Sequence, residues 1–165
     1  MLGQDLVMYD EEFKLIDAEL HRLLAQANAK VVFLVDKNGQ LIAATGETEN
    51  LDTTSLASLT AGNIAATGGM AKLLGEKEFS ILFHEGARDN IHISIIGQRV
   101  ILVVIFDQRS SLGLVRLRVK KSAEILGNIF GQLLVKVETE KSSGKTAADS
   151  PFAEITDEDI DKLFG

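Results

Sequence analysis

The chain has no cysteine and no tryptophan, only one proline, and aromatic residues make up just 5% of its 165 positions. Without cysteine it can form no disulfide bond, no thiolate metal site and no cysteine nucleophile. It has no apolar run near the ~18 residues that a membrane-spanning helix needs. Residues 1–5 also lack the basic start and apolar core of a signal peptide. These absences predict a cytoplasmic protein without membrane insertion.

Positive charge is scarce as well. The chain has 17 Lys and Arg against 24 Asp and Glu, which gives a formal net charge of −7. A protein that binds a phosphate backbone should be basic, so this balance argues against a nucleic-acid partner. The length suits one domain of ordinary size, and 45% apolar residues are enough for a substantial core.

The sequence contains no motif of a known active site. The glycines of the segment 68–72 precede a lysine, but the phosphate-loop spacing is absent and the segment lies within a predicted helix. His21, His84 and His92 have no ligand-like spacing. His84 and His92 could face each other across a hairpin as a metal pair, or they could be hydrogen-bonded polar residues on strands. We therefore predict no catalytic residue, no metal site and no cofactor.

Hydrophobic periodicity divides the chain into three helices and five strands. Asp52 is placed to cap the second helix, and Asn38-Gly39 forms a hairpin turn because this pair tolerates positive φ. His92 and Ser94 alternate with apolar residues on the fourth strand and face away from them. The predicted helices are 10–27, 52–75 and one that starts after 111, and the predicted strands are 31–35, 41–45, 79–85, 90–96 and 100–106.

The strand order follows from the connections and from apolar content. Hairpins should pair the first strand with the second, the third with the fourth, and the fourth with the fifth. The first and fifth strands are the most apolar, so they should pair at the centre. This predicts an α/β sandwich: a five-stranded antiparallel sheet of order 2-1-5-4-3, with the crossover helix on one face and two helices on the other.

The third strand becomes an edge in this order. It carries Phe79, Ile81 and Phe83 and no charge among them, and an apolar edge of this kind invites pairing with another chain. A homodimer whose sheet continues across this edge would pair the strand and cover its apolar side chains. The alternative is that a loop or the tail covers the edge.

The second helix has a stripe with almost no side chains. Alanine or glycine recurs at four-residue spacing, which places these residues on one helical face. The opposite face carries large apolar residues and is expected to form its core stripe, at Leu56, Leu59, Met70, Leu73 and Leu74. The bare stripe is either a docking face or one side of a helix that is buried on both sides; it comprises Ala57, Ala61, Ala65 and Gly69, widened by Gly62 and Gly68 and closed by Lys72.

A basic group lies near the start of the third helix. It contains Arg116, Arg118, Lys120 and Lys121, of which Arg116 and Lys120 share one side at i, i+4 spacing. These two could meet an acidic partner or a phosphate, or they could belong to a solvated helix start. Arg109 and Arg116 are candidates for an arginine finger that acts on a GTPase.

A polar segment precedes a distinct tail. Residues 138–150 form a predicted flexible linker between a domain at 1–137 and a C-terminal segment at 151–165. Thr156 starts a variant capping box, and the short amphipathic helix that follows needs a surface to cover it. That surface is a partner or the body of the same subunit; the apolar residues involved are Phe152, Ile155, Ile160, Leu163 and Phe164.

Four segments of the chain carry a specific resemblance. Residues 30–41 (KVVFLVDKNGQL), 52–63 (DTTSLASLTAGN), 111–118 (SLGLVRLR) and 150–155 (SPFAEI) resemble the MglB family. That family belongs to the Roadblock/dynein-light-chain fold, and its members act in bacterial cell polarity and gliding motility. The element order of this chain is similar to that fold.

The resemblance implies a homodimeric GTPase-activating protein for a Ras-like small GTPase of the MglA type, with two subunits for one GTPase and a location near a cell pole. It implies that the paired second helices form the platform for the GTPase. The GTPase would bind GTP and Mg²⁺ and supply its own catalytic groups, without an arginine finger from the activator. The tail would contact the GTPase a second time and affect nucleotide exchange. The alternatives are a Roadblock scaffold that binds a GTPase or motor complex without stimulating hydrolysis, and a small-molecule enzyme.

Overall fold

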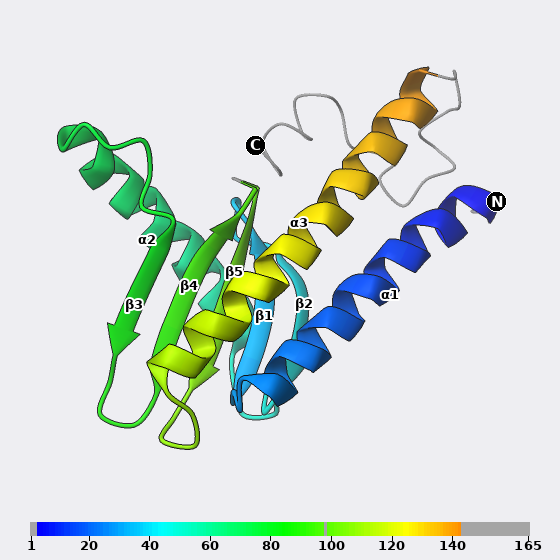
Figure 1. The fold of residues 1–165 in the computed structure, drawn as a ribbon. Helices are drawn as coiled ribbons and strands as arrows, with labels where there is room; N and C mark the ends of the chain where they lie inside the picture. The colour runs from blue at the N-terminus through cyan, green and yellow to red at the C-terminus, as the bar shows by residue number, and fades with distance from the viewer. Residues whose placement is uncertain (1–2, 98, 143–165) are drawn as a thin grey trace.

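The computed structural model describes residues 3–97 and 99–142, with side chains described over 10–97 and 99–139. One antiparallel sheet lies between a pair of helices and a single helix (Figure 1). The helices are α1 (Gly3–Gln26), α2 (Thr53–Leu73) and α3 (Leu112–Ser142), and the strands are β1 (Val31–Asp36), β2 (Leu41–Gly46), β3 (Ile81–Glu85), β4 (Asn90–Ile96) and β5 (Val100–Phe106).

The strand order is β2-β1-β5-β4-β3, and the prediction is confirmed. The two most apolar strands, β1 and β5, pair at the centre, with Phe33 opposite Val103. Every residue of β1 and β5 is buried, because helices cover both faces of the sheet there. β3 has one neighbour, β4, and its other side is an edge.

The two faces of the sheet have separate cores. α1 and α3 cover one face, where Leu20, Leu102 and Leu126 are fully buried. α2 crosses the other face, over Phe33 and Val103 (Figure 1). The predicted division, with one crossover helix opposite two helices, is confirmed.

Local signals in the sequence set the turns and caps. The Asp36 carboxylate accepts hydrogen bonds from the backbone N–H groups of Asn38 (2.8 Å) and Gln40 (3.0 Å), which holds the β1–β2 turn. Gly39 in that turn has φ +91°, a conformation that favours glycine. Asp52 caps α2 as predicted, since its Oδ1 accepts from the backbone N–H of Ser55 at 3.0 Å.

Several element boundaries differ from the prediction, most of them by one or two residues. α1 begins at Gly3 rather than at residue 10, and β3 begins at Ile81 rather than at Phe79. α3 continues to Ser142, past the predicted end of the domain at Val137, because the polar residues there still extend the helix that the apolar stripe established. The first part of the predicted linker is therefore helical, and residues 143–165 lie outside the described part of the chain.

Polar contacts fix the register of α1 against α3. Lys136 forms an ion pair with the buried Glu12 at 2.5 Å, and the hydroxyl of Ser122 donates to Glu19 at 2.7 Å. Arg22 also pairs with Glu19, at 2.6 Å. Each of these buried carboxylates has at least one donor, as burial of a charge requires.

Candidate functional site

α2 is a surface helix with almost no charge. Lys72, in its last turn, is the only ionisable residue between Thr53 and Leu73. Ala57, Thr60 and Ala71 are its only fully buried residues. A solvated helix face normally carries charged side chains. The solvent face of α2 therefore has the composition of a surface that another molecule covers.

The predicted core stripe of α2 is wrong for four of its five residues. Leu59 is 70% exposed, Met70 is 56% exposed and Leu73 is 89% exposed, and Leu74 is exposed beside them. Leu56 alone packs against the core beneath the helix. The large apolar residues of α2 therefore point mainly away from their own sheet.

The side-chain-poor stripe is divided between the core and the surface. Ala57 is fully buried against the sheet, so its assignment to the docking face is wrong for this subunit. Ala61 is half-buried and lies over the β1–β2 turn, where a Cβ at Gly39 would come 3.5 Å from it. Ala65 and Lys72 are exposed.

The glycines of α2 leave open space above the helix. A Cβ added at Gly62, Gly68 or Gly69 would meet no atom within 4 Å. Since these positions project nothing, another backbone can come close to this part of α2. They lie beside the exposed Leu59 and Met70 along the same helix. We call the surface of Leu59, Gly62, Ala65, Gly69, Met70 and Leu73 the α2 face.

The edge strand β3 is apolar on one side and tied to α2 on the other. Ile81 is 54% exposed, and Phe79 is half-buried just before the strand. Phe83 stacks on Phe106 with ring centroids 6.1 Å apart, so it belongs partly to the core of its own subunit. The amide of Asn63 donates to Nε2 of His84 at 3.0 Å and joins α2 to this strand.

The structure does not bring the basic group together with the α2 face. Arg116 and Lys120 lie exposed on α3, on the opposite face of the sheet. Arg116 acts instead on the buried His92 of β4: burial, with the positive charge of Arg116, holds the pKa of this histidine below its ordinary value. One flat docking surface cannot contain both α2 and these α3 residues.

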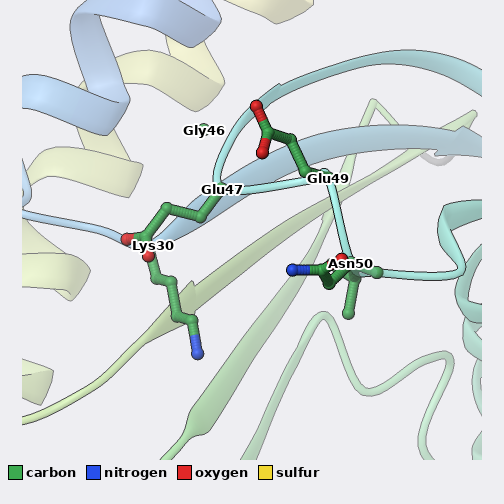
Figure 2. A pocket seen from close by; sticks show the side chains of 6 residues that line it. Lys30, Gly46, Glu47, Glu49 and Asn50 are labelled. Atoms are coloured by element: carbon green, nitrogen blue, oxygen red, sulfur yellow. The ribbon is translucent and has the colours of Figure 1, made fainter.

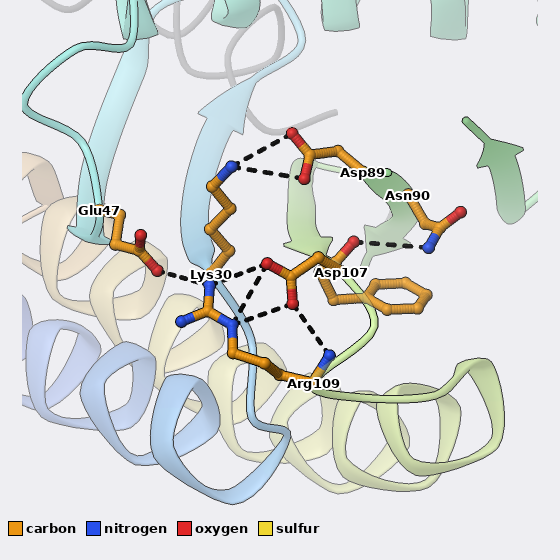
Figure 3. Close-up of polar contacts among 7 residues, drawn as sticks. Lys30, Glu47, Asp89, Asn90, Asp107 and Arg109 are labelled. Carbon is orange, nitrogen blue, oxygen red and sulfur yellow. Dashed lines mark hydrogen bonds and ion pairs between the residues drawn. The ribbon is translucent and has the colours of Figure 1, made fainter. Parts of the chain in front are cut away.

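Arg109 is held in a network of charges and does not project freely. Its guanidinium pairs with Asp107 at 2.9 Å and with Glu47 at 2.7 Å (Figure 3). Hydrogen bonds from Arg109 lower the pKa of the Asp107 carboxyl to about 2. Lys30 pairs with Asp89 at 3.2 Å in the same region. These charged residues come from four loops: the loops before β1, after β2, between β3 and β4, and after β5. Because the guanidinium of Arg109 is held by these neighbours, Arg109 is a poor candidate for an arginine finger.

A pocket of about 540 Å³ lies next to this network. Glu47, Glu49 and Asn50 project from the chain that follows β2, and Lys30 comes from the segment before β1 (Figure 2). Two of its three charged side chains are used in ion pairs, since Lys30 binds Asp89 and Glu47 binds Arg109, and the third, Glu49, is exposed. The pocket therefore presents no nucleophile and base in contact, and we assign it a structural role.

The metal-pair hypothesis for His84 and His92 is wrong. Phe83 lies opposite His92, and Ile91 lies opposite His84, so the two imidazoles project from opposite faces of the sheet. His92 and Ser94 are buried beneath α3, and no hydrogen-bond partner contacts their side chains. Among the residues that the structure describes, no group of three or more His, Cys, Asp or Glu is placed to hold a metal ion.

A comparison with protein-family models decides the family. The model of the Roadblock/LC7 domain matches residues 15–106, which include α2 and all five strands. The chain belongs to the Roadblock/LC7 family. No match was found among the curated protein sequences.

Solved structures place this Roadblock chain near the MglB proteins. MglB of Myxococcus xanthus is 65% identical with a TM-score of 0.69, over 71% of this chain and 95% of that one. The gliding protein MglB of Thermus thermophilus is 32% identical with a TM-score of 0.68, over 72% and 90%. An MglB with a tetrameric arrangement is also 32% identical with a TM-score of 0.68, over 72% and 89%.

Two features of this Roadblock site were not predicted. The exposed leucines of α2 were assigned to the core, although the absence of charge in this helix before Lys72 was a signal of a covered surface. The charge network of Arg109 joins residues such as Glu47 that no local spacing links. The predicted tail contacts Phe152, Ile155, Ile160, Leu163 and Phe164 lie outside the described residues. In the described part of the chain, no helix is long and apolar enough to cross a membrane.

Proposed function

We propose that this chain is a homodimeric activator of a Ras-like small GTPase of the MglA type, and that the GTPase binds on the paired α2 helices. The observation that carries the proposal is the α2 face: an exposed helix with Leu59, Met70 and Leu73 outward and no charge before Lys72. The likeness to MglB proteins supports the class of partner, and a role in cell polarity follows from it.

Dimerisation is the first step of the proposal. Two β3 edges would pair, so that the sheet continues from one subunit into the other and the exposed Ile81 becomes buried. The relative with a tetrameric arrangement supports association between copies in this family. Pairing at β3 would also bring two α2 helices together, because each α2 is joined to its own β3 through Asn63 and His84.

Activation would work by differential binding. A protein accelerates hydrolysis without an active site if it binds the hydrolysis-competent state of the GTPase more tightly than the resting state. The open backbone at Gly62 and Gly69 would let switch segments lie close to α2. The GTPase would hold GTP and Mg²⁺ and provide its own catalytic groups. Arg109 takes no part, because Asp107 and Glu47 already bind its guanidinium.

Single-turnover GTP hydrolysis by an MglA-type GTPase, with and without this protein, tests the proposal. We expect the rate to rise with the concentration of this protein and to saturate. Binding to the GTP-loaded form without faster hydrolysis would show a Roadblock scaffold instead of an activator. If this protein neither binds the GTPase nor stimulates hydrolysis, the GTPase assignment is refuted.

The tail 151–165 would make a second contact with the GTPase and alter nucleotide exchange. Truncation after Ser150 should leave the dimer intact, since α1–α3 and the sheet are unchanged. The rate of release of a fluorescent guanine nucleotide from the GTPase should differ between the full chain and the truncated chain. Equal release rates would remove the tail from the exchange reaction.

A further inference from the structure

A groove lies between α1 and the C-terminal half of α3, on the side of the sheet away from α2. It has a volume of about 740 Å³. In this region both helices extend past the ends of the strands (Figure 1). The residues that line it are Glu12, Gly127, Asn128, Gly131, Gln132, Val135 and Lys136. We call it the α1–α3 groove.

Small side chains make the α1–α3 groove accessible. A Cβ at Gly131 would meet no atom within 4 Å, and a Cβ at Gly127 would only reach ordinary contact with Ile96, at 3.7 Å. Val135 is 60% exposed next to them. The groove therefore offers a bare helical backbone and an apolar side chain to an occupant.

One buried polar atom in the groove lacks a partner. Glu12 is only 4% exposed, and Lys136 binds its Oε1, but Oε2 has no hydrogen-bond donor. A buried carboxylate oxygen without a donor costs free energy. An occupant that supplies an N–H or O–H group to this oxygen would remove that cost.

We propose that the C-terminal segment 151–165 of the same chain binds in the α1–α3 groove when no GTPase is present. Reach permits it: α3 is described to Ser142, and Gly131 lies about 17 Å back along the helix at 1.5 Å per residue. The intervening residues 143–150 can span more than about 25 Å when extended. The segment can therefore turn back beside α3 without strain.

The chemistry of the segment suits the groove. Its apolar residues Ile160, Leu163 and Phe164 can pack against Val135 and the glycine backbones. Lys162 is its one cation and can donate to Oε2 of Glu12, and Lys136 can meet its carboxylates, which are Glu154, Asp157, Glu158, Asp159 and Asp161. Because the segment is tethered, a high effective concentration lets even weak contacts hold it in place.

The groove and the GTPase would then compete for one segment. This consequence rests on the proposed function, in which the tail contacts the GTPase. In the free protein the groove would hold the tail, and binding of the GTPase would draw it away. The tail would become available for nucleotide exchange only in the complex.

Disulfide trapping tests the proposal, since the chain has no cysteine of its own. The full-length variant Gly131→Cys with Leu163→Cys should form an intrachain disulfide under mild oxidation, because the bond forms only when the two Cα atoms approach within about 7 Å. The matched control is Thr139→Cys with Leu163→Cys. Thr139 is exposed on α3, outside the groove and nearer the tether.

A tail that moved at random would react at Thr139 at least as fast as at Gly131, because ring closure favours the shorter loop; we expect the groove pair to react at least ~10-fold faster. Adding Val135→Asp should slow the groove pair to the rate of the control. Equal rates for the two pairs would overturn the proposal. Mixing the two singly substituted proteins measures the disulfide that forms between different chains. The proposal is also overturned if the disulfide forms only between different chains.

Adding the GTPase separates this proposal from the proposed function. A slower groove disulfide in the presence of GTP-loaded GTPase supports both the docking of the tail and its release. A groove disulfide that forms in the free protein and is unaffected by the GTPase supports the docking and removes the tail from the GTPase contact.

Discussion

The side-chain amide of Asn63 in α2 lies 3.0 Å from Nε2 of His84 in β3 and donates a hydrogen bond to it. The bond joins α2, whose solvent face carries no charge before Lys72, to β3 at the edge of the sheet. The two surfaces in the proposed function are therefore parts of one unit. Any association that fixes the position of β3 also fixes the position of α2.

The α2 face predicts the effect of an arginine at Ala65. Ala65→Arg places a long charged side chain on an exposed helix position, so the free energy of unfolding should change by less than ~0.5 kcal/mol. The affinity for the GTPase should fall at least ~100-fold, because a buried charge without a partner costs several kcal/mol. The matched control is Ala18→Arg on the exposed side of α1. Stimulation of hydrolysis by Ala65→Arg at the wild-type level would remove α2 from the docking surface.

The edge strand predicts that Ile81→Lys weakens association between copies. Ile81 is half exposed in one subunit and would become buried in the dimer, so the substitution removes that burial from both copies. Lysine on an edge strand opposes strand pairing, so the dissociation constant should rise at least ~10-fold. Analytical ultracentrifugation measures it. Leu117→Lys, at an exposed position of α3, should leave it unchanged; equal effects of the two substitutions would place the interface elsewhere.

The buried His92 predicts a loss of stability in mild acid. Its pKa is lowered in the folded protein, chiefly by burial, from the ordinary value of 6.5. The unfolded chain therefore binds this proton first as the pH falls below ~6.5, and the free energy of unfolding decreases by up to ~1.4 kcal/mol per pH unit until the folded pKa is reached. His92→Leu should remove this slope between pH 6.5 and 5 in urea titrations. The same slope in both proteins would assign the effect to another group.

Two glycines predict opposite effects of a single added methyl group. Gly46 has φ +104°, and a Cβ there would overlap the carbonyl oxygen of Lys30, so Gly46→Ala should destabilise the fold by about 2–4 kcal/mol. Gly62 is helical with open space around it, so Gly62→Ala should stabilise the fold by up to ~1 kcal/mol. Urea denaturation at one protein concentration compares them. A stable Gly46→Ala variant would show that the chain before β1 can move.

Much of the fold could be predicted because the apolar content of each strand indicates how close it lies to the centre of the sheet. β1 and β5 consist almost wholly of apolar residues, which places them at the centre of a sheet covered on both faces. Asp52 caps α2 as predicted, and the turn at Asn38-Gly39 forms as predicted with positive φ at Gly39 but not at Asn38.

The surface of α2 could not be assigned in the same way. Periodicity identifies an apolar face of a helix, but a face that packs on its own sheet and a face that another molecule covers have the same pattern. Leu59 and Leu73 follow the pattern of a core and are exposed, whereas Ala57 is buried. The separation of His84 from His92 depended on strand register, which the spacing of the two residues does not fix. The pairing of Arg109 with Glu47 depended on the folded chain as a whole.

The anchoring of α2 is uneven along its length, and this has an evolutionary consequence. Ala57, near its start, is fully buried against the sheet, while Leu73, at its end, is 89% exposed. Sequence drift in the opening turns is constrained by the need to keep the subunit intact. In the closing turns Ala71 is buried as well, but the exposed positions beside it, such as Leu73, carry little of that constraint and can change toward a different recognition target while the scaffold stays the same.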